Sequence, residues 1–455
     1  MSNNLFSSRI GFILATAGSA IGLGNIWRFP YLVMEEGGSN FIFLYFLCIF
    51  FIGVPLLVVE FTIGRSSQNK SSLITIFQNN HKLAHLFSRL SYIFLFTLIV
   101  IISYYSVVAG WVLIYFVKSL FGLISYQNES INYYKDFLQI LFNSNYEVGF
   151  ATIFIIIFTL SINFLGITKG IERFNFFMLP LLFIILIVMI FKVLTLNGSE
   201  KGLHFLIHLD LTSITYKNIF AALGQSFFSL SLGMGVMIVY ASYLNKKESI
   251  INNSIITAFL GSVVGIFSSL IIIPIIFAFN QESSSGVGLT MLALPSIFSQ
   301  ISHGSFYAIL FFGLMLVAAL TSTISIVEPL LNYTTNKFKI SKLTACFFVG
   351  ISIIFLSIIQ INSFNNLSHI KIFNQDIFTF TSGVFSDVLL SLGSIIACIY
   401  CGFILTKSVV LKEINQNNQN SLYLKIYQTV WLFSIQYLIP LILLYLGYKS
   451  LSNLF

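Results

Sequence analysis

Two long apolar stretches are each interrupted by a cluster of small residues. The first cluster is GSAIGLGN (18–25) and the second is FSLSLGMG (228–235). Glycine lowers the stability of a helix by about 1 kcal/mol relative to alanine, so clusters of glycine make local unwinding cheap. Unwound backbone has free carbonyl groups that can bind a cation, and the N-terminal end of a half-helix can bind an anion. Glycines can also serve only close helix packing, but two matched clusters with neighbouring Asn and Ser favour a binding site.

Other polar side chains lie in apolar surroundings and could complete such a site. Hydroxyl groups like those of Thr321 and Ser322 often bond back to a carbonyl of their own helix, but they are also oxygen ligands of the kind that hard cations prefer. An arginine such as Arg28 costs about 2.5–3.5 kcal/mol at mid-membrane, so its presence is rarely accidental. We expect Glu60 to bind the exposed backbone of a broken helix. Tyr105 either packs or donates a hydrogen bond to a substrate carboxylate.

The composition is that of a membrane protein. Hydrophobic residues make up 57% of the chain and charged residues 8%, against about 25% charged residues in a soluble domain. The net charge of +8 comes from basic residues scattered through short loops, which argues against a nucleic-acid-binding protein. The apolar stretches hold no nucleophile with a His or an acidic residue at a reachable spacing, so we do not expect an enzyme.

These stretches predict an all-α membrane protein, because about 20 apolar residues suffice to cross a bilayer. We predict eleven spans, at 10–34, 40–64, 88–121, 148–166, 174–195, 217–241, 254–280, 305–334, 342–361, 377–406 and 423–448. The segment 288–300 is too short to cross and is predicted to be a re-entrant or extracellular hairpin. Lys and Arg are more frequent in the loops that are inside if the N-terminus is inside, which predicts a cytoplasmic N-terminus in the cell membrane.

The two interrupted helices are the first and the sixth, which is the spacing of two five-helix repeats inverted relative to each other. We therefore predict one transporter domain, 1–455, made of a first repeat (10–195), a second, inverted repeat (217–406) and an additional helix (423–448). Two connections, 122–147 and 196–216, are long loops. The polar stretch 414–420 is predicted to be a cytoplasmic linker.

Several motifs together resemble the neurotransmitter:sodium symporter family, in particular its bacterial branch with eleven spans. They are GSAIGLGNIWRFPY (18–31), GVPLLVVEFTIGR (53–65), KGIERF (169–174), GQSFFSLSLGMG (224–235), YASY (240–243), LPSIFSQ (294–300) and LTSTISI (320–326). The first and sixth segments are highly specific, and the resemblance covers about ten of the eleven spans. It implies the fold of inverted repeats with two broken helices that is known for these transporters.

The resemblance also implies two sodium sites. The favoured site comprises the carbonyl groups of Gly18, Ile21 and Ala318 and the hydroxyl groups of Thr321 and Ser322. The second comprises the carbonyl of Ala20, the side chain of Asn25, Ser229 and the substrate carboxylate. The seventh helix, which normally completes the second site, has Gly261 and Gly265 at the aligned positions, with Ser262 as a possible substitute. Chloride coupling stays open, although Tyr45, Gln225 and Ser229, which resemble anion ligands, are present.

For the substrate, the resemblance implies a pocket between the two broken helices and the third and eighth helices. Its residues are Ala20, Leu23, Gly24, Ile101, Tyr105, Phe228, Ser229, Ser231, Met234, Ser322 and Ile326. Gly22 stands where monoamine carriers of the family have an Asp, which argues for an amino acid. The apolar lining suggests an apolar or aromatic side chain. The resemblance thus predicts a sodium-coupled amino acid symporter that works by alternating access; the alternative is a substrate-binding sensor or an uncoupled carrier with the same fold.

The resemblance also implies residues that act as gates. Arg28, Phe228, Tyr105 and Tyr243 are expected to close the two sides of the pocket. The position aligned with the acidic partner of Arg28 in the tenth helix is Ser382, and Asp376 and Asp387 are the nearest acids. The usual inner Arg–Asp pair is replaced by Asn3 and Asn336, so we expect looser gating or a different closing network.

Overall fold

The computed structural model describes residues 5–67, 72–78, 82–124, 131–280, 288–414 and 422–452. Asn3 and residues 415–420 of the predicted linker lie outside the described residues. The described chain is almost entirely helical. Its strands, β1 (Lys371–Ile372) and β2 (Gln375–Asp376), form one short antiparallel hairpin in which Lys371 pairs with Asp376.

Long apolar helices make up the body of the molecule. Six run without a break: α7 (Tyr92–Leu120), α9 (Asn145–Phe164), α10 (Arg173–Leu194), α14 (Ile250–Ala278), α16 (Gly304–Phe338) and α17 (Lys342–Asn362). Others are joined through π-helical turns: α3 (Ser39–Cys48) to α4 (Val54–Ser66), α18 (Ile377–Phe380) to α19 (Ser386–Ile399), and α21 (Leu422–Phe433) to α22 (Ile439–Ser452).

The predicted spans agree with the helices of the structure to within a few residues. Among the described residues, nine helices are long and apolar enough to cross a membrane. The tenth is a pair bent by 56°, consisting of α1 (Arg9–Ala20) and the segment Gly24–Glu35, which ends with α2 (Phe29–Glu35). The remaining predicted span, 217–241, is divided into α12 (Tyr216–Ser229) and α13 (Val236–Ser242), and neither is long enough to cross alone.

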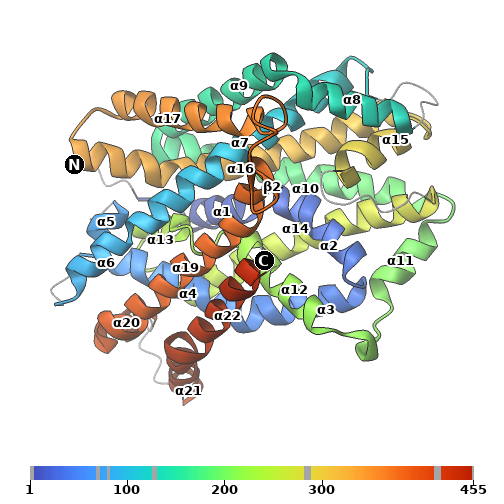
Figure 1. The fold of residues 1–455 in the computed structure, drawn as a ribbon. Helices are drawn as coiled ribbons and strands as arrows, with labels where there is room; N and C mark the ends of the chain where they lie inside the picture. Colours follow the sequence, from blue (N-terminus) through green and yellow to red (C-terminus); the bar gives the residue numbers. More distant parts are fainter. Residues whose placement is uncertain are drawn as a thin grey trace.

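Short helices cover both ends of the long ones (Figure 1). One end carries α5 (Leu73–Ile76), α6 (Ala84–Leu90) and α20 (Lys407–Ile414); the opposite end carries α8 (Ile131–Asn143), α11 (Ser199–Ile207) and α15 (Leu294–Phe298). The charge distribution predicts that the second end faces outside, and we call it the outer end. The predicted loops 122–147 and 196–216 thus contain helices α8 and α11, which are too short and too polar to show as spans.

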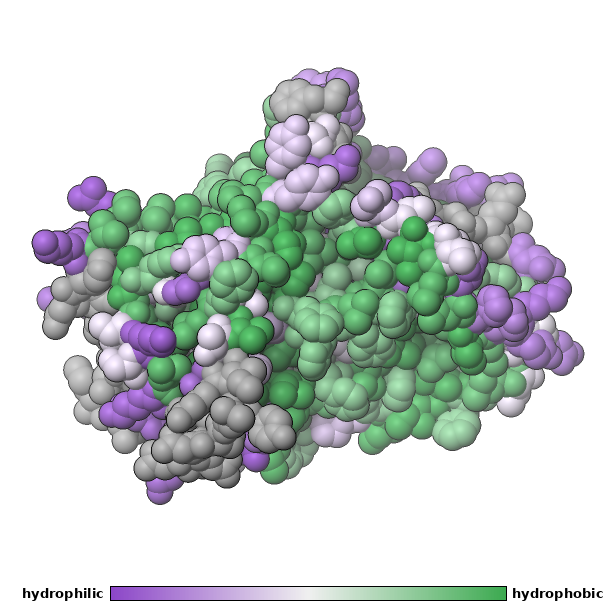
Figure 2. Space-filling view, turned by 90° about the horizontal axis from the view of Figure 1, so that it is seen from below, coloured by the Kyte–Doolittle hydropathy of each residue, from purple (hydrophilic) through white to green (hydrophobic). Residues whose placement is uncertain are grey.

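A broad apolar band separates hydrophilic side chains at the two ends of the molecule (Figure 2). Large hydrophobic residues are exposed along it, for example Phe50, Phe150 and Phe355. Such a surface is stable only in contact with lipid. The structure therefore agrees with the all-α, multi-pass membrane protein that the composition predicts.

The broken helices lie inside the bundle, where longer helices surround them. Helix α1 packs against α14, α16 and α10, and α13 packs against α4. Helix α7 packs along α16 and faces the same interior. This arrangement places the two interruptions against α7 and α16, where unwound backbone is shielded from lipid.

Candidate functional site

The backbone between α12 and α13 leaves the helical conformation because three of its residues have positive φ. They are Ser231 (52°), Gly233 (76°) and Gly235 (78°). Glycine adopts such angles without strain, whereas a serine does so at a cost. The Ser231 hydroxyl donates to the Ser19 carbonyl at 2.8 Å. The two broken segments are thus joined directly at the centre of the bundle.

Glu60 supports this break from α4. Its Oε1 accepts a hydrogen bond from the Gly233 amide at 2.7 Å, and the carboxylate is buried. An unpaired amide in the membrane interior would cost several kcal/mol. The prediction that Glu60 binds the exposed backbone of a broken helix is confirmed.

Four of the five residues predicted for the favoured sodium site, Ile21, Ala318, Thr321 and Ser322, meet between the end of α1 and α16, while the fifth, Gly18, lies against Asn175 of α10. The Thr321 hydroxyl lies 3.3 Å from the Ile21 carbonyl oxygen and 3.0 Å from that of Ala318. The Ser322 hydroxyl lies 3.5 Å from the same Ile21 oxygen. These oxygens are uncharged and buried. The arrangement offers several oxygen ligands to one hard cation.

The second predicted site has its residues together but lacks a side chain from α14. Gly261 faces it: a Cβ atom added there would lie 3.6 Å from the Ala20 Cβ and 3.7 Å from both the Asn25 amide nitrogen and the Ser229 carbonyl oxygen. The Asn25 amide donates to the Gly261 carbonyl at 2.8 Å. Ser262 points elsewhere, donating to the Ala258 carbonyl at 2.9 Å, so it does not replace the missing ligand.

A buried cluster of neutral hydrogen-bonding groups adjoins this site. Ser262 Oγ lies 3.4 Å from the Tyr45 hydroxyl, and the Gln225 amide donates to Ser229 Oγ at 3.0 Å. All four side chains are at most 1% exposed. Helix α14 contributes no acidic residue anywhere along its length. The cluster carries no negative charge that would repel an anion, but the Gln225 amide also donates to the Gly24 carbonyl at 3.1 Å, so an anion would have to replace some of these bonds.

Tyr105 and Gly22 define the part of the substrate pocket nearest to the favoured sodium site. The Tyr105 hydroxyl accepts a hydrogen bond from the Leu23 amide at 2.9 Å. A Cβ atom added at Gly22 would lie 2.7 Å from Ser322 Oγ and 2.9 Å from the Tyr105 hydroxyl, closer than side-chain atoms tolerate. Only glycine therefore fits here without a shift of these two hydroxyl groups.

Most of the remaining predicted pocket residues are closed from solvent. Those from helices α1, α7, α16 and the second break are at most 6% exposed: Ala20, Leu23, Ile101, Ser231, Met234 and Ile326. Phe228 covers Gly24, because a Cβ atom added at Gly24 would overlap the Phe228 ring. The guanidinium of Arg28 also lies over that ring, 5.2 Å from its centroid.

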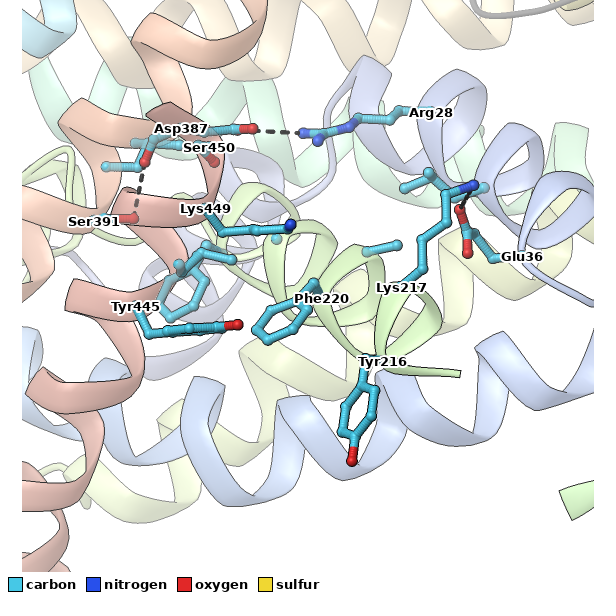
Figure 3. Close-up of a pocket in the computed structure, with 16 residues that line it drawn as sticks. Arg28, Glu36, Tyr216, Lys217, Phe220, Asp387, Ser391, Tyr445, Lys449 and Ser450 are labelled. Atoms are coloured by element: carbon cyan, nitrogen blue, oxygen red, sulfur yellow. Dashed lines mark hydrogen bonds and ion pairs between the residues drawn. The ribbon is translucent and has the colours of Figure 1, made fainter. Parts of the chain in front are cut away.

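The predicted outer gate contains an ion pair, and the sequence had left its acidic member open. Arg28 pairs with Asp387 at 3.9 Å (Figure 3). The aligned residue, Ser382, instead donates to the Phe378 carbonyl at 2.7 Å, and Asp376 caps α18. The reason is a π-helical turn at Thr381–Phe385 with a kink at Gly383, which changes the register that a regular helix would give.

The Arg28–Asp387 pair lies in the wall of a cavity of about 960 Å³, which we call the outer cavity because Glu36, Lys217 and Lys449, near the outer ends of their helices, also line it (Figure 3). Of the predicted site residues it includes only Arg28. The predicted substrate pocket is therefore separated from the cavity by Phe228 and the Arg28–Asp387 pair.

At the end predicted to face the cytoplasm, the structure has hydrogen bonds that the sequence did not predict. Asn332 donates to the Tyr243 hydroxyl and, at 3.0 Å, to Glu328, a buried acid on α16. Glu172 accepts hydrogen bonds from the amide and hydroxyl of Ser7. An acid within the predicted span 305–334 was the available signal for Glu328.

A second inner group ties the start of α1 and the end of α4 to their neighbours. Arg9 forms an ion pair with Glu248 at 3.4 Å, and the buried Arg65 forms one with Glu413 at 2.7 Å. Asn336 bonds to the Asn332 carbonyl at 2.7 Å. The expectation of a different closing network agrees with these contacts.

Comparisons with known proteins agree on one family. The sequence matches the sodium:neurotransmitter symporter family over residues 3–139 and 124–454. It is 34% identical to an uncharacterized sodium-dependent transporter of Haemophilus influenzae, over 99% of this chain and 98% of that protein. It is 26% identical to the sodium- and chloride-dependent taurine transporter of Bos taurus, over 71% of this chain and 59% of that one.

A solved structure extends the comparison to the fold. The crystal structure of MhsT in complex with L-phenylalanine matches with a TM-score of 0.87 and 34% sequence identity. The match covers 98% of this chain and 99% of that chain.

Proposed function

The chain belongs to the sodium:neurotransmitter symporter family and is a sodium-dependent, multi-pass membrane transporter, and from this premise we propose that it is a symporter of a small zwitterionic amino acid. The amino acid has an apolar or aromatic side chain. Transport is by alternating access, with the N-terminus in the cytoplasm and the pocket opening in turn to each side of the cell membrane.

The observation that carries this proposal is the uncharged cradle around Gly22. The Tyr105 hydroxyl lies on the Leu23 amide at 2.9 Å, and Gly22 leaves no space for a side chain beside it. An amine without a carboxylate would need an acid here to balance its charge. A zwitterion brings its own carboxylate, which the Tyr105 hydroxyl and the amides of the broken helix can bind.

The apolar side chain is inferred from the types of the predicted pocket residues. Ile101, Met234 and Ile326 are apolar and buried, and the Phe228 ring lies against Gly24. A flexible methionine adapts to ligands of different shape. MhsT, which shares the fold, binds L-phenylalanine in its crystal structure, so phenylalanine is the first substrate to test.

Sodium would bind to the oxygens of Gly18, Ile21, Ala318, Thr321 and Ser322. With a zwitterionic substrate, each sodium ion moves one positive charge inward. An inside-negative potential then contributes about 2.3 kcal/mol per charge and 100 mV. Because Gly261 supplies no side-chain oxygen to the second site, we propose that one sodium ion accompanies each substrate.

The neutral cluster of Tyr45, Gln225, Ser229 and Ser262 would bind chloride. Helix α14 has no acid, so a chloride ion would supply the missing negative charge beside the site without being carried inward, and the net charge moved per substrate stays at one. The taurine transporter relative, which is chloride-dependent, supports this proposal.

The test is uptake of labelled amino acids into proteoliposomes, with an inward sodium gradient and a potassium control, for the wild type and Ser322→Ala. We expect sodium-dependent accumulation of an apolar or aromatic amino acid that the substitution abolishes. Equal uptake in potassium would remove sodium coupling. Binding without uptake would establish the alternative, a substrate-binding sensor.

A further inference from the structure

An apolar groove lies on the side of the molecule between α12 and α22, backed by the junction of α3 and α4. Its volume is about 420 Å³. It is lined by Cys48, Ile52, Ile219, Phe220, Leu223, Leu441, Ile442 and Tyr445. Leu441 is 65% exposed and Ile219 is 38% exposed, so the groove opens on the surface that faces lipid. Such an opening is filled by hydrocarbon rather than by water.

The groove adjoins the outer cavity that Figure 3 shows. Phe220 and Tyr445 line both, and their rings pack against each other with centroids 5.0 Å apart. This ring pair marks the boundary between the apolar groove and a space with charged walls. A molecule with a charged end and an apolar chain could place its charged end in the outer cavity and its chain in the groove.

Two of the three cations that line the outer cavity are already in ion pairs. Arg28 pairs with Asp387, and Lys217 pairs with Glu36 at 2.8 Å. Among the described lining residues, Lys449 is the cation without an ion-pair partner. It is exposed and extends from α22 into the space above Phe220 (Figure 3). A phosphate group is the kind of ligand that a free lysine ammonium attracts.

Both helices present their side chains in the same order from the outer end inward. On α22 the residues Lys449, Tyr445 and Leu441 follow at intervals of four, and on α12 Lys217, Phe220 and Leu223 follow at intervals of three. These spacings place each set on one helix face. Each helix therefore offers a cation, then an aromatic ring, then an aliphatic side chain, over roughly 12 Å on α22 at about 1.5 Å per residue.

Exposed tyrosines indicate where the membrane surface lies. Tyr216, Tyr445 and Tyr448 are 83%, 51% and 67% exposed near the outer ends of α12 and α22. Tyrosine gathers at the level of the lipid headgroups. Lys449 follows Tyr448 directly and so lies at the height of the phosphates, with the groove below it at the height of the acyl chains.

We propose that an anionic phospholipid binds here, with its phosphate on Lys449, near Lys217, and an acyl chain in the groove between α12 and α22. The lipid bridges α12, which is the outer half of the second broken helix, and the additional helix α22. It thereby holds α12 in the position that closes the pocket from outside. This binding is independent of the proposed sodium coupling.

The proposal is tested by native mass spectrometry of the purified protein with equal amounts of phosphatidylglycerol and phosphatidylcholine. The wild type should retain phosphatidylglycerol preferentially. Lys449→Gln should lower this retention about fivefold, the size expected for one lysine at an anionic lipid surface. The matched control is Lys201→Gln on α11, which is also an exposed lysine at the outer end, and it should leave retention unchanged.

A second variant tests the groove separately from the charge. Ile219→Trp fills the groove from its partly exposed edge and should displace both lipids while sodium-dependent uptake shows that the protein is folded. Equal retention of the two lipids by the wild type, or equal losses in Lys449→Gln and Lys201→Gln, would overturn the proposal. So would undiminished retention in Ile219→Trp.

Discussion

We expect the number of sodium ions per substrate to be limited by the side chain that Gly261 lacks, and Gly261→Asn should supply it. The added Cβ would contact Ala20, Asn25 and Ser229 at 3.6–3.7 Å, which is ordinary van der Waals distance. The amide oxygen would then complete a second set of oxygen ligands beside the substrate. Because asparagine also forms helix somewhat better than glycine, we expect the variant to fold.

The size of the effect follows from the charge that a second sodium ion carries. At 100 mV, inside negative, one more charge contributes about 2.3 kcal/mol. Since each 1.4 kcal/mol is a factor of ten, the limiting accumulation ratio should rise about fiftyfold from the potential alone. The charge moved per substrate should increase from about one to about two.

The assay is parallel measurement of charge and substrate flux into proteoliposomes at clamped potential. Gly261→Ala is the control, because it adds the same Cβ without an oxygen and should keep a ratio of one. A wild-type ratio of two would refute the reasoning, since it would mean that the second site works without a side chain from α14. An unchanged ratio in Gly261→Asn, with uptake retained, would show that this position does not limit sodium binding.

Three further predictions concern the substrate, the outer gate and the anion. Tyr105→Phe removes a hydrogen bond to a charged carboxylate, worth about 1.5–3 kcal/mol, so the half-saturating substrate concentration should rise at least tenfold; a change below threefold would contradict the assigned role. Asp387→Asn breaks an ion pair with Arg28 whose side chains are 32% and 29% exposed, and such a pair contributes about 0.2–1 kcal/mol. Bound labelled substrate should therefore dissociate up to about fivefold faster. Slower dissociation would contradict the role of the pair as a gate. Replacing chloride with gluconate should lower uptake by the wild type, and Ser262→Ala should lose this dependence; equal wild-type uptake in both salts would exclude an anion site.

Much of the fold could be predicted because the bilayer imposes a simple rule on the sequence. Spans such as 305–334 and 342–361 were placed within a few residues of α16 and α17. The amphipathic segments that became α8 and α11 gave no such signal, because they lie at the ends of the bundle and are not long apolar runs.

Some contacts of the candidate site could be predicted from the sequence and others could not. Glu60 could be matched to a broken helix because a buried acid needs a partner, and Gly233 provides one. The partner of Arg28 could not be predicted, because the π-helical turn at Thr381–Phe385 changes which residues share a face with Asp387. Asn332, which also binds Glu328, was missed because its hydrogen bond to Tyr243 joins separate helices.

The sequence by itself determined that this is a membrane protein with two broken helices, since apolar length and clustered glycine are local properties, and its motifs resemble a family of transporters. The resemblance also implies that Gly22 stands where the monoamine carriers of the family have an Asp. Only the tertiary structure decided that Gly261 faces Ala20 and Asn25 while Ser262 faces Tyr45, and that Lys449 lies above an apolar groove. These facts depend on the rotation of one helix against its neighbours, which packing sets and which no pattern along a single helix contains.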